Sequence, residues 1–287
     1  AREEASKRGI AITGSEIVGV VPYEAMRQSA VYYLRRMRKS TGIPVPDLIE
    51  TAIQSLGLRD VAPFEIKEKV LGMPEIDGPL AQRATFDFVD AVSRDSPAPG
   101  GGSVAALAGA LGGALAAMVA NLSVSKAEFD DQYEVLCKIA GQSQAIKDKL
   151  VLGVDQDTAA FDLVLEAMRM PRDTETERDE RANAMEEGYK VATLVPLATV
   201  EQCCDTLRLC AEIAPITDPN MVSDVGTGAL LAHAGAQAAA YNVRINLPHI
   251  TDEDFEAETH VTLTNLLAEC SELAAAVATE VERGLGS

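Results

Sequence analysis

The chain has 287 residues, of which 47% are hydrophobic and 24% charged, so it can bury a sizeable core and does not have the composition of a disordered protein. Its net charge is −19, and the acidic excess lies in residues 73–287, which contain 35 Asp and Glu and 14 Lys and Arg. Residues 1–72 contain 9 Asp and Glu and 11 Lys and Arg. Such an acidic surface repels nucleic acid and anionic membranes, so we expect neither as a partner.

The first 72 residues have the pattern of the last part of an α/β domain. A charged helix over residues 1–9 is followed by a short predicted strand over residues 9–13, with the sequence GIAIT. Two helices are then predicted, over about 23–39 and over 47–56, and the second stops at Gly57. Because a lone strand leaves its backbone unpaired, its sheet must be completed elsewhere. Residues 73–81, rich in Gly, Pro and acidic residues, are predicted to be a linker.

Residues 82–287 show no strand alternation and are predicted to form an all-helical domain, so the fold class is mainly α, preceded by an α/β remnant. Thr174 with Glu177 fits a capping box, and Thr251 with Asp254 is a looser version. The uncharged segment Val104–Ala120 is dominated by Ala and Gly and predicts a buried helix rather than a membrane span. Helices are expected at 82–94, 103–122, 127–168, 174–212, 223–243 and 252–284.

The five cysteines and three histidines show no metal-ligand spacing, so no metal site is expected. An odd number of cysteines without a CxxC pair is typical of reduced, mostly buried thiols. No signal peptide is recognisable, and we therefore expect a cytoplasmic protein.

The turn Pro97–Ser103 is the first candidate for a functional role. Its glycines free the backbone, and Ser103 stands where a helix N-cap is expected, so several N–H groups and the helix dipole would converge on one spot. It is not a P-loop, because no Gly-Lys-Ser/Thr follows. The alternative is a close helix–helix contact that merely requires glycine.

The second candidate is the pair Asp155 and Asp157, in the middle of a predicted helix. Two residues apart, they point about 200° from each other and form no carboxylate dyad, so at most one faces a given pocket. A buried Asp beside an apolar wall such as Phe161 would have a raised pKa suited to proton transfer. The alternative is two solvated aspartates on an acidic surface.

A third candidate segment begins at Ser223 and Asp224 and ends near Asn242 and Asn246. Paired amides suit a heterocycle with alternating donors and acceptors, although turn residues before Pro248 have the same composition. Asp224 would, in the simpler interpretation, cap the helix.

Four segments in order resemble the formimidoyltetrahydrofolate cyclodeaminase/cyclohydrolase family and cover nearly all of residues 82–287. Residues 1–72 resemble the end of a glutamate formimidoyltransferase domain, which implies a bifunctional protein lacking most of its first domain and without transferase activity of its own. The resemblance also implies a helical homodimer or higher homo-oligomer with the folate site near the subunit contact. The four segments are FVDAVSRDSPAPGGGSVAALAGALGGALAAMVANLS (86–123), VDQDTAAFDLVLEAMRMP (154–171), ERDERANAMEEGYKVATLVPL (177–197) and SDVGTGALLAHAGAQAAAYNVRINLPHITDEDF (223–255).

The activity implied by this resemblance is conversion of 5-formimidoyltetrahydrofolate to 5,10-methenyltetrahydrofolate and ammonia. The family's catalytic aspartate matches Asp157. The tetrahydrofolate substrate, in polyglutamylated form, is expected to meet the residues Gly100, Gly101, Gly102, Ser103, Lys126, Asp155, Asp224 and Asn242. The alternatives are a methenyltetrahydrofolate cyclohydrolase and a non-catalytic folate-binding or assembly module.

Overall fold

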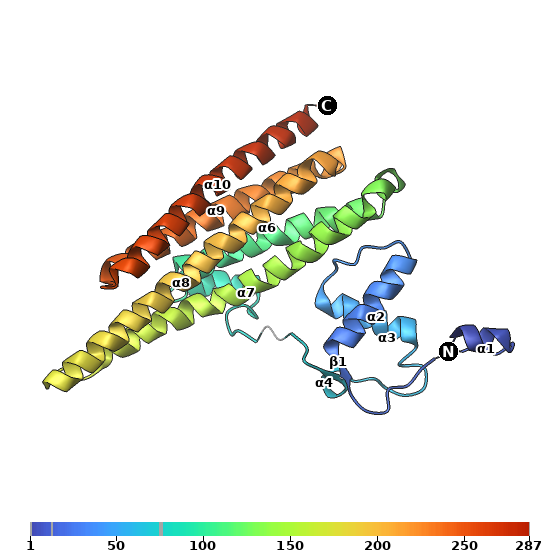
Figure 1. Cartoon of the computed structure of the whole chain (residues 1–287), viewed down its shortest axis with the longest axis horizontal. Helices are drawn as coiled ribbons and strands as arrows, with labels where there is room; N and C mark the ends of the chain where they lie inside the picture. Colours follow the sequence, from blue (N-terminus) through green and yellow to red (C-terminus); the bar gives the residue numbers. More distant parts are fainter. Residues whose placement is uncertain (1, 13, 75–76, 287) are drawn as a thin grey trace.

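The computed structural model describes residues 2–12, 14–74 and 77–286. Long helices lie alongside one another in a bundle, and a smaller N-terminal unit packs at its side, next to the helix α7 (Tyr133–Arg169) (Figure 1). The protein is mainly helical, as predicted. Thr13 of the predicted strand and Glu75 and Ile76 of the predicted linker lie outside the described residues, as do the two terminal residues.

The N-terminal unit has its own apolar cluster, formed mainly by the helices α2 and α3. The strand predicted over residues 9–13 is wrong for the described part, because residues 10–12 have no regular structure and Ile10 is 59% exposed, without a sheet to pack on. A two-residue parallel pair forms instead, with Val21 opposite Val70. The elements are α1 (Arg2–Lys7), β1 (Val21–Pro22), α2 (Tyr23–Arg36), α3 (Val45–Leu56), α4 (Ile66–Lys69) and β2 (Val70–Leu71).

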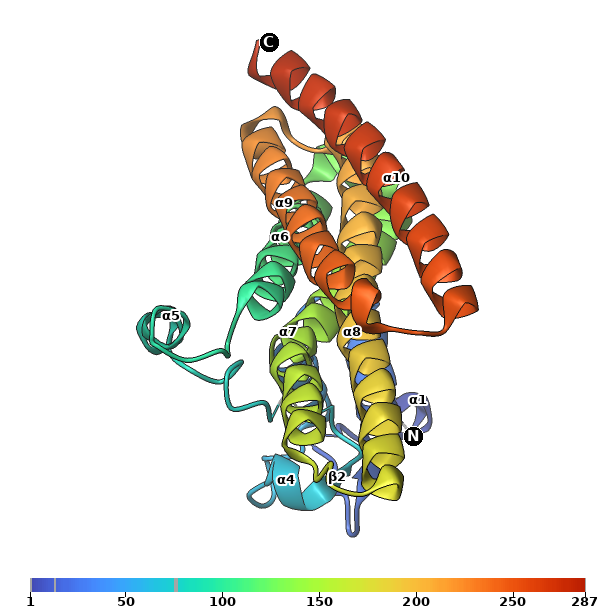
Figure 2. The ribbon, with the colours of Figure 1, turned by 90° about the vertical axis from the view of Figure 1, so that its left-hand side faces the viewer.

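The bundle is built from the helices predicted beyond residue 81, with boundaries that differ by a few residues. The capping box at Thr174 is present, whereas the last helix is capped by Asp252, whose side chain accepts from the N–H of Phe255, and not by Thr251. A short helix, α5, lies at the side of the bundle (Figure 2), and its buried Phe88 packs in one apolar cluster with Ala106 and Val154 of the bundle. The elements are α5 (Thr85–Val92), α6 (Gly101–Val124), α7 (Tyr133–Arg169), α8 (Glu175–Ile213), α9 (Val222–Asn246) and α10 (Glu253–Leu285), with 3₁₀ turns η1 (Ala127–Gln132), η2 (Ala214–Ile216), η3 (Pro219–Met221) and η4 (Leu247–His249).

Helix α6 is the buried helix that the sequence predicts. By length and composition both α6 and α10 would suffice to cross a membrane, but 61% of the most apolar stretch of α6 is buried inside the bundle. Glycines bring α6 close to α9, because a Cβ on Gly112 would lie only 2.7 Å from the carbonyl oxygen of Gly228. Most of the apolar stretch of α6 is therefore used in helix packing, and one row of apolar side chains remains exposed.

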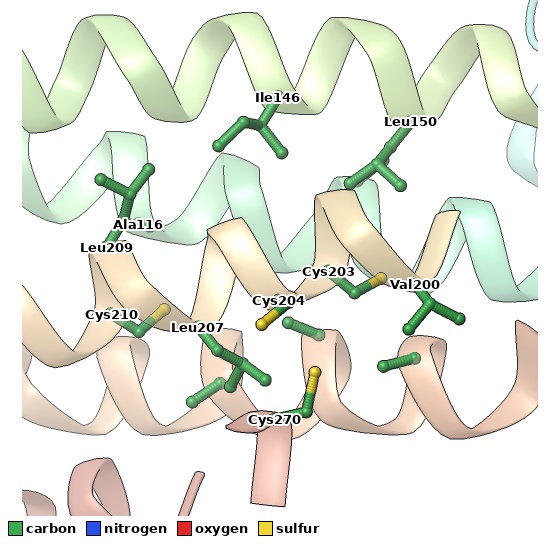
Figure 3. Packing of buried hydrophobic residues seen from close by; sticks show 14 of the residues in the cluster. Ala116, Ile146, Leu150, Val200, Cys203, Cys204, Leu207, Leu209, Cys210 and Cys270 are labelled. Atoms are coloured by element: carbon green, nitrogen blue, oxygen red, sulfur yellow. The ribbon is translucent and has the colours of Figure 1, made fainter. Parts of the chain in front are cut away.

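The core between α6, α8, α9 and α10 contains Cys203, Cys204, Cys210 and Cys270 (Figure 3), and the fifth cysteine, Cys137, comes from α7. All five are free and buried, as predicted. Burial raises the pKa of the Cys203 and Cys210 thiols to about 12. These thiols are therefore protonated near neutral pH and serve as small apolar side chains.

The N-terminal unit is fastened to the bundle by a polar joint around Gly42. The hydroxyl of Ser40 donates to Oδ1 of Asn121 over 2.6 Å, and the amide of Asn121 donates to the carbonyl of Gly42 over 3.0 Å. A Cβ on Gly42 would overlap with Ala140 on α7. The joint thus depends on a close backbone approach that only glycine allows.

Candidate active site

The residue before α6 is Gly100, which has no side chain with which to cap the helix. The helix begins at Gly101, two residues earlier than expected, after Gly100 in an extended conformation. The prediction that Ser103 is the N-cap is therefore wrong, because Ser103 lies inside the first turn and its buried hydroxyl donates to the carbonyl of Val154 over 2.8 Å. Among the described residues no hydrogen-bond acceptor is found for the N–H groups of Gly101 and Gly102, so both remain available to a polar group.

Asp157 of α7 lies directly against this uncapped turn. Its carboxyl group occupies the space that a side chain on Gly102 would fill, so a Cβ there would overlap with Oδ1. The hydroxyl of Ser103 approaches Oδ2 at 3.2 Å. Burial raises the pKa of Asp157, and hydrogen bonds from the side chain and backbone of Ser103 only partly offset this. The group is thus suited to taking up and releasing a proton nearer neutrality than an ordinary Asp.

The turn and Asp157 open onto a cavity of about 330 Å³, a size at the lower end of small-molecule sites. Asn242 and Asn246 of α9 also line it, and their amides donate to the carbonyls of Ala238 (3.0 Å) and Ala192 (2.7 Å). Each side-chain oxygen is thereby left as an acceptor. The lining residues are Pro97, Ala98, Gly100, Gly101, Asp157, Thr158, Phe161, Tyr189, Ala192, Asn242, Ile245, Asn246 and His249.

Five of the eight predicted binding residues do not line this cavity: Gly102 and Ser103 are buried in the first turn of α6, against Asp157, and the other three lie elsewhere. Asp155 holds the linker instead, since its two carboxylate oxygens accept from the N–H groups of Leu80 (2.8 Å) and Ala81 (2.9 Å). Lys126 follows the other end of α6, on the order of 35 Å from Gly101, where it pairs with Asp218.

Asp224 is also remote, because it lies in the first turn of α9, about 27 Å along the helix from Asn242. Within one chain, Asp155, Asp224 and Lys126 therefore do not line this cavity. Among the described residues that line the cavity, none is Lys or Arg.

Two cavity residues escaped the sequence analysis. Tyr189 comes from α8 and His249 from η4, and their rings stack with centroids 4.4 Å apart and planes 18° apart. They are separated from each other by 60 residues and from Asp157 by 32 or more, so no local pattern links them. The signal that could have found them is that both lie in segments of the family resemblance, residues 177–197 and 223–255. In the described part of the chain no cluster of three metal-ligating side chains is found.

The geometry defines a helical bundle with a small-molecule site around one partly buried carboxyl group, and comparison with known proteins identifies its family. The sequence profile of the formiminotransferase-cyclodeaminase family matches residues 85–265, and that of the formiminotransferase domain matches residues 1–73. The chain belongs to the formiminotransferase-cyclodeaminase family. It is 35% identical to the formimidoyltransferase-cyclodeaminase of Mus musculus over 286 residues, which cover 98% of this chain and 53% of that protein. The chain thus spans about half the length of such relatives.

Two shorter proteins match about two thirds of this chain. The methenyltetrahydrofolate cyclohydrolase of Methylorubrum extorquens is 36% identical over 186 residues, or 65% of this chain and 89% of that protein. The crystal structure of formiminotetrahydrofolate cyclodeaminase from Thermotoga maritima superposes with a TM-score of 0.64 at 28% identity, covering 70% of this chain and 96% of that one. Both names describe folate enzymes.

Proposed function

We propose that this chain catalyses the cyclodeamination of 5-formimidoyltetrahydrofolate to 5,10-methenyltetrahydrofolate and ammonia. The observation that carries the proposal is Asp157, a half-buried carboxyl group with a raised pKa beside the uncapped start of α6, in a cavity of small-molecule size. Membership of the family and the names of the relatives support the choice of substrate.

Asp157 is the group to which we assign the proton transfers. N10 of the substrate attacks the formimidoyl carbon, so a bond forms between them, and the bond from that carbon to the amino nitrogen then breaks. The proton lost by N10 leaves with the ammonia, so a carboxylate that accepts it from N10 and donates it to the amino group is regenerated. One group near both nitrogens thus serves both steps, a contribution worth roughly 10²–10⁴ in rate.

We assign the polar end of the substrate to the turn Gly100–Ser103 and to Asn242. The uncapped N–H groups of the turn are donors, and the side-chain oxygen of Asn242 is an acceptor. A pterin ring carries both kinds of partner. Gly101 and Asn242 are close neighbours, since a Cβ on Gly101 would lie 3.6 Å from Nδ2 of Asn242.

The second candidate is a methenyltetrahydrofolate cyclohydrolase, which the Methylorubrum relative favours because the match spans 89% of that protein at 36% identity. The purified chain would be given 5-formimidoyltetrahydrofolate or 5,10-methenyltetrahydrofolate in separate reactions, with methenyl absorbance and ammonia followed in each. Methenyl formation with equimolar ammonia supports the cyclodeaminase. The cyclohydrolase is supported, and the cyclodeaminase contradicted, by two results together. Methenyl absorbance is lost well above the uncatalysed rate, and 5-formimidoyltetrahydrofolate releases no ammonia.

A non-catalytic folate-binding or assembly module is the third alternative. Titration with tetrahydrofolate should raise the melting temperature of the chain, because a ligand that binds only the native state stabilises it. Binding without turnover of either substrate would favour a binding module. No rise in melting temperature and no turnover would favour an assembly module.

We further propose that the chain acts as a homo-oligomer in the cytoplasm. Rows of apolar side chains are exposed on the neighbouring helices α6 and α9, and the α9 row reaches the cavity at Ile245, which is 68% exposed. Apolar rows of this kind are typical of subunit contacts. The rows consist of Val104, Leu111, Met118 and Leu122 on α6 and Leu230, Tyr241 and Ile245 on α9.

A further inference from the structure

The turn that carries His249 is held against one face of α8. Glu186 accepts from the N–H groups of Thr251 (2.9 Å) and Asp252 (3.2 Å), and these bonds help to lower its pKa, the bond from Thr251 contributing most. One turn further along α8, Lys190 donates to Asp252 over 2.8 Å. The residues 186, 189 and 190 share a face of the helix, so the position of the turn is fixed from a single surface.

His249 lies at the centre of this arrangement, on top of Tyr189. Tyr189 is buried, with 8% of its surface exposed, while His249 is exposed, and both rings line the cavity. The offset between nearly parallel rings at 4.4 Å is that of a stable aromatic pair. The pair thus presents a flat, preorganised surface to the cavity, supported from beneath by the bundle.

The rest of the cavity differs from this wall in its chemistry. Asp157, the N–H groups at the start of α6 and the oxygens of Asn242 and Asn246 gather hydrogen-bonding groups. A folate likewise has two unlike rings, a pterin with many donors and acceptors and an aminobenzoyl ring with a plain aromatic face. The second ring is bonded directly to N10, so it must lie beside the group that exchanges a proton with N10.

We propose that the aminobenzoyl ring of the folate stacks on His249, which is thereby a positioning residue that sets where N10 stands relative to Asp157. The inference rests on the proposed function and assigns to His249 a role that needs its flat ring and not its proton. The competing interpretation is that the imidazole transfers a proton. A phenylalanine at this position could replace the ring in stacking but could not replace the imidazole in proton transfer.

The experiment compares the full chain with the variants His249→Ala and His249→Phe, and with His260→Ala as a matched control on the exposed surface of α10. Affinity is measured by calorimetry for tetrahydrofolate and for a tetrahydropterin without the aminobenzoyl-glutamate part. His249→Ala should weaken tetrahydrofolate binding about three- to tenfold, the range of one aromatic stack, and leave the tetrahydropterin unchanged. His249→Phe and His260→Ala should bind both ligands like the parent chain.

Turnover separates stacking from proton transfer. His249→Phe should keep its rate and its pH profile within about twofold, whereas His249→Ala should show a raised KM. Three results would overturn the proposal while leaving the proposed function intact. His249→Phe could lose turnover, His249→Ala could bind both ligands equally more weakly, or His249→Ala could bind both as tightly as the parent chain. A parent chain that binds tetrahydrofolate but turns over neither substrate overturns the function instead, and one that does not bind tetrahydrofolate overturns both.

Discussion

At the scale of single residues, the contact between Gly102, Ser103 and Asp157 decides the chemistry of the site. The hydroxyl of Ser103 has one hydrogen, and its shorter bond goes to Val154, so it gives the ionised Asp157 only partial support. A protonated Asp157 can donate to the same oxygen of Ser103. The pair therefore tolerates both protonation states, as a group that passes a proton must.

The raised pKa of Asp157 predicts how stability depends on pH. The native state holds the proton more tightly than the unfolded chain, so ionisation of Asp157 destabilises the fold as the pH rises from the unfolded pKa, about 3.9, through the native one. Relative to Asp157→Asn, the parent chain should thus lose stability across this range and show a constant deficit above it. Urea unfolding of both proteins from pH 4 to pH 8 measures the difference. A difference that does not change with pH, or grows in favour of the parent chain, would contradict the assigned environment.

The sequence was informative about single residues wherever local geometry sufficed. Helical spacing alone shows that Asp155 and Asp157 cannot face the same pocket, and they do not: one holds the linker and the other lines the cavity. Positions along the chain, in contrast, do not reveal which ends of long helices meet. Lys126 was therefore misplaced, and His249 was missed because its partner Tyr189 comes from another helix.

At the scale of elements, glycine determines how closely α6 and α9 pack. In Gly112→Ala the new methyl would meet the carbonyl oxygen of Gly228 at 2.7 Å, so one backbone must shift. We expect a loss of about 1–3 kcal/mol in the free energy of unfolding.

The matched control for this helix contact is Gly141→Ala on α7, where a Cβ would meet nothing within 4 Å. The same substitution should stabilise the helix there by about 0.5–1 kcal/mol, since alanine is the better helix former. Chemical denaturation of both variants checks the pair. If Gly112→Ala and Gly141→Ala change the free energy of unfolding equally, then helix propensity, and not the α6–α9 contact, determines the change.

Most elements follow from local rules, and those that do not have a physical reason. Apolar periodicity, the capping box at Thr174 and the stop at Gly57 located the long helices to within a few residues. The short strands were not predicted, because a two-residue strand at Val21 exists only through its pairing with Val70, about fifty residues away. Pairing between distant segments leaves no local signal in a single sequence.

At the scale of the whole molecule, the exposed apolar rows on α6 and α9 predict self-association. Leu230 of α9 is 71% exposed, and Leu230→Glu would place a charge within the row. The parent chain should sediment as a dimer or larger and this variant as a smaller species. Val261→Glu on α10, at a residue 58% exposed but outside the rows, should not change the mass. A monomeric parent chain, or an unchanged mass for Leu230→Glu, would show that these rows do not form the contact.

The division of the molecule into residues 1–72, a linker over 73–81 and residues 82–287 is a proposal at the same scale. The separate apolar cluster of the N-terminal unit and the polar joint between Ser40 and Asn121 support two units fastened to each other. The anchoring of the linker by Asp155 supports a fixed path between them.

The central claim is that Asp157 carries the proton in ring closure, and the rate of methenyl formation from 5-formimidoyltetrahydrofolate tests it most directly. Asp157→Asn should reduce this rate by roughly 10²–10⁴ while tetrahydrofolate still raises the melting temperature, because the amide fills the same space but exchanges no proton. Asp162→Asn, the same change at an exposed position of α7, should leave the rate unchanged. A folded Asp157→Asn chain that closes the ring within a few-fold of the parent rate would contradict the account.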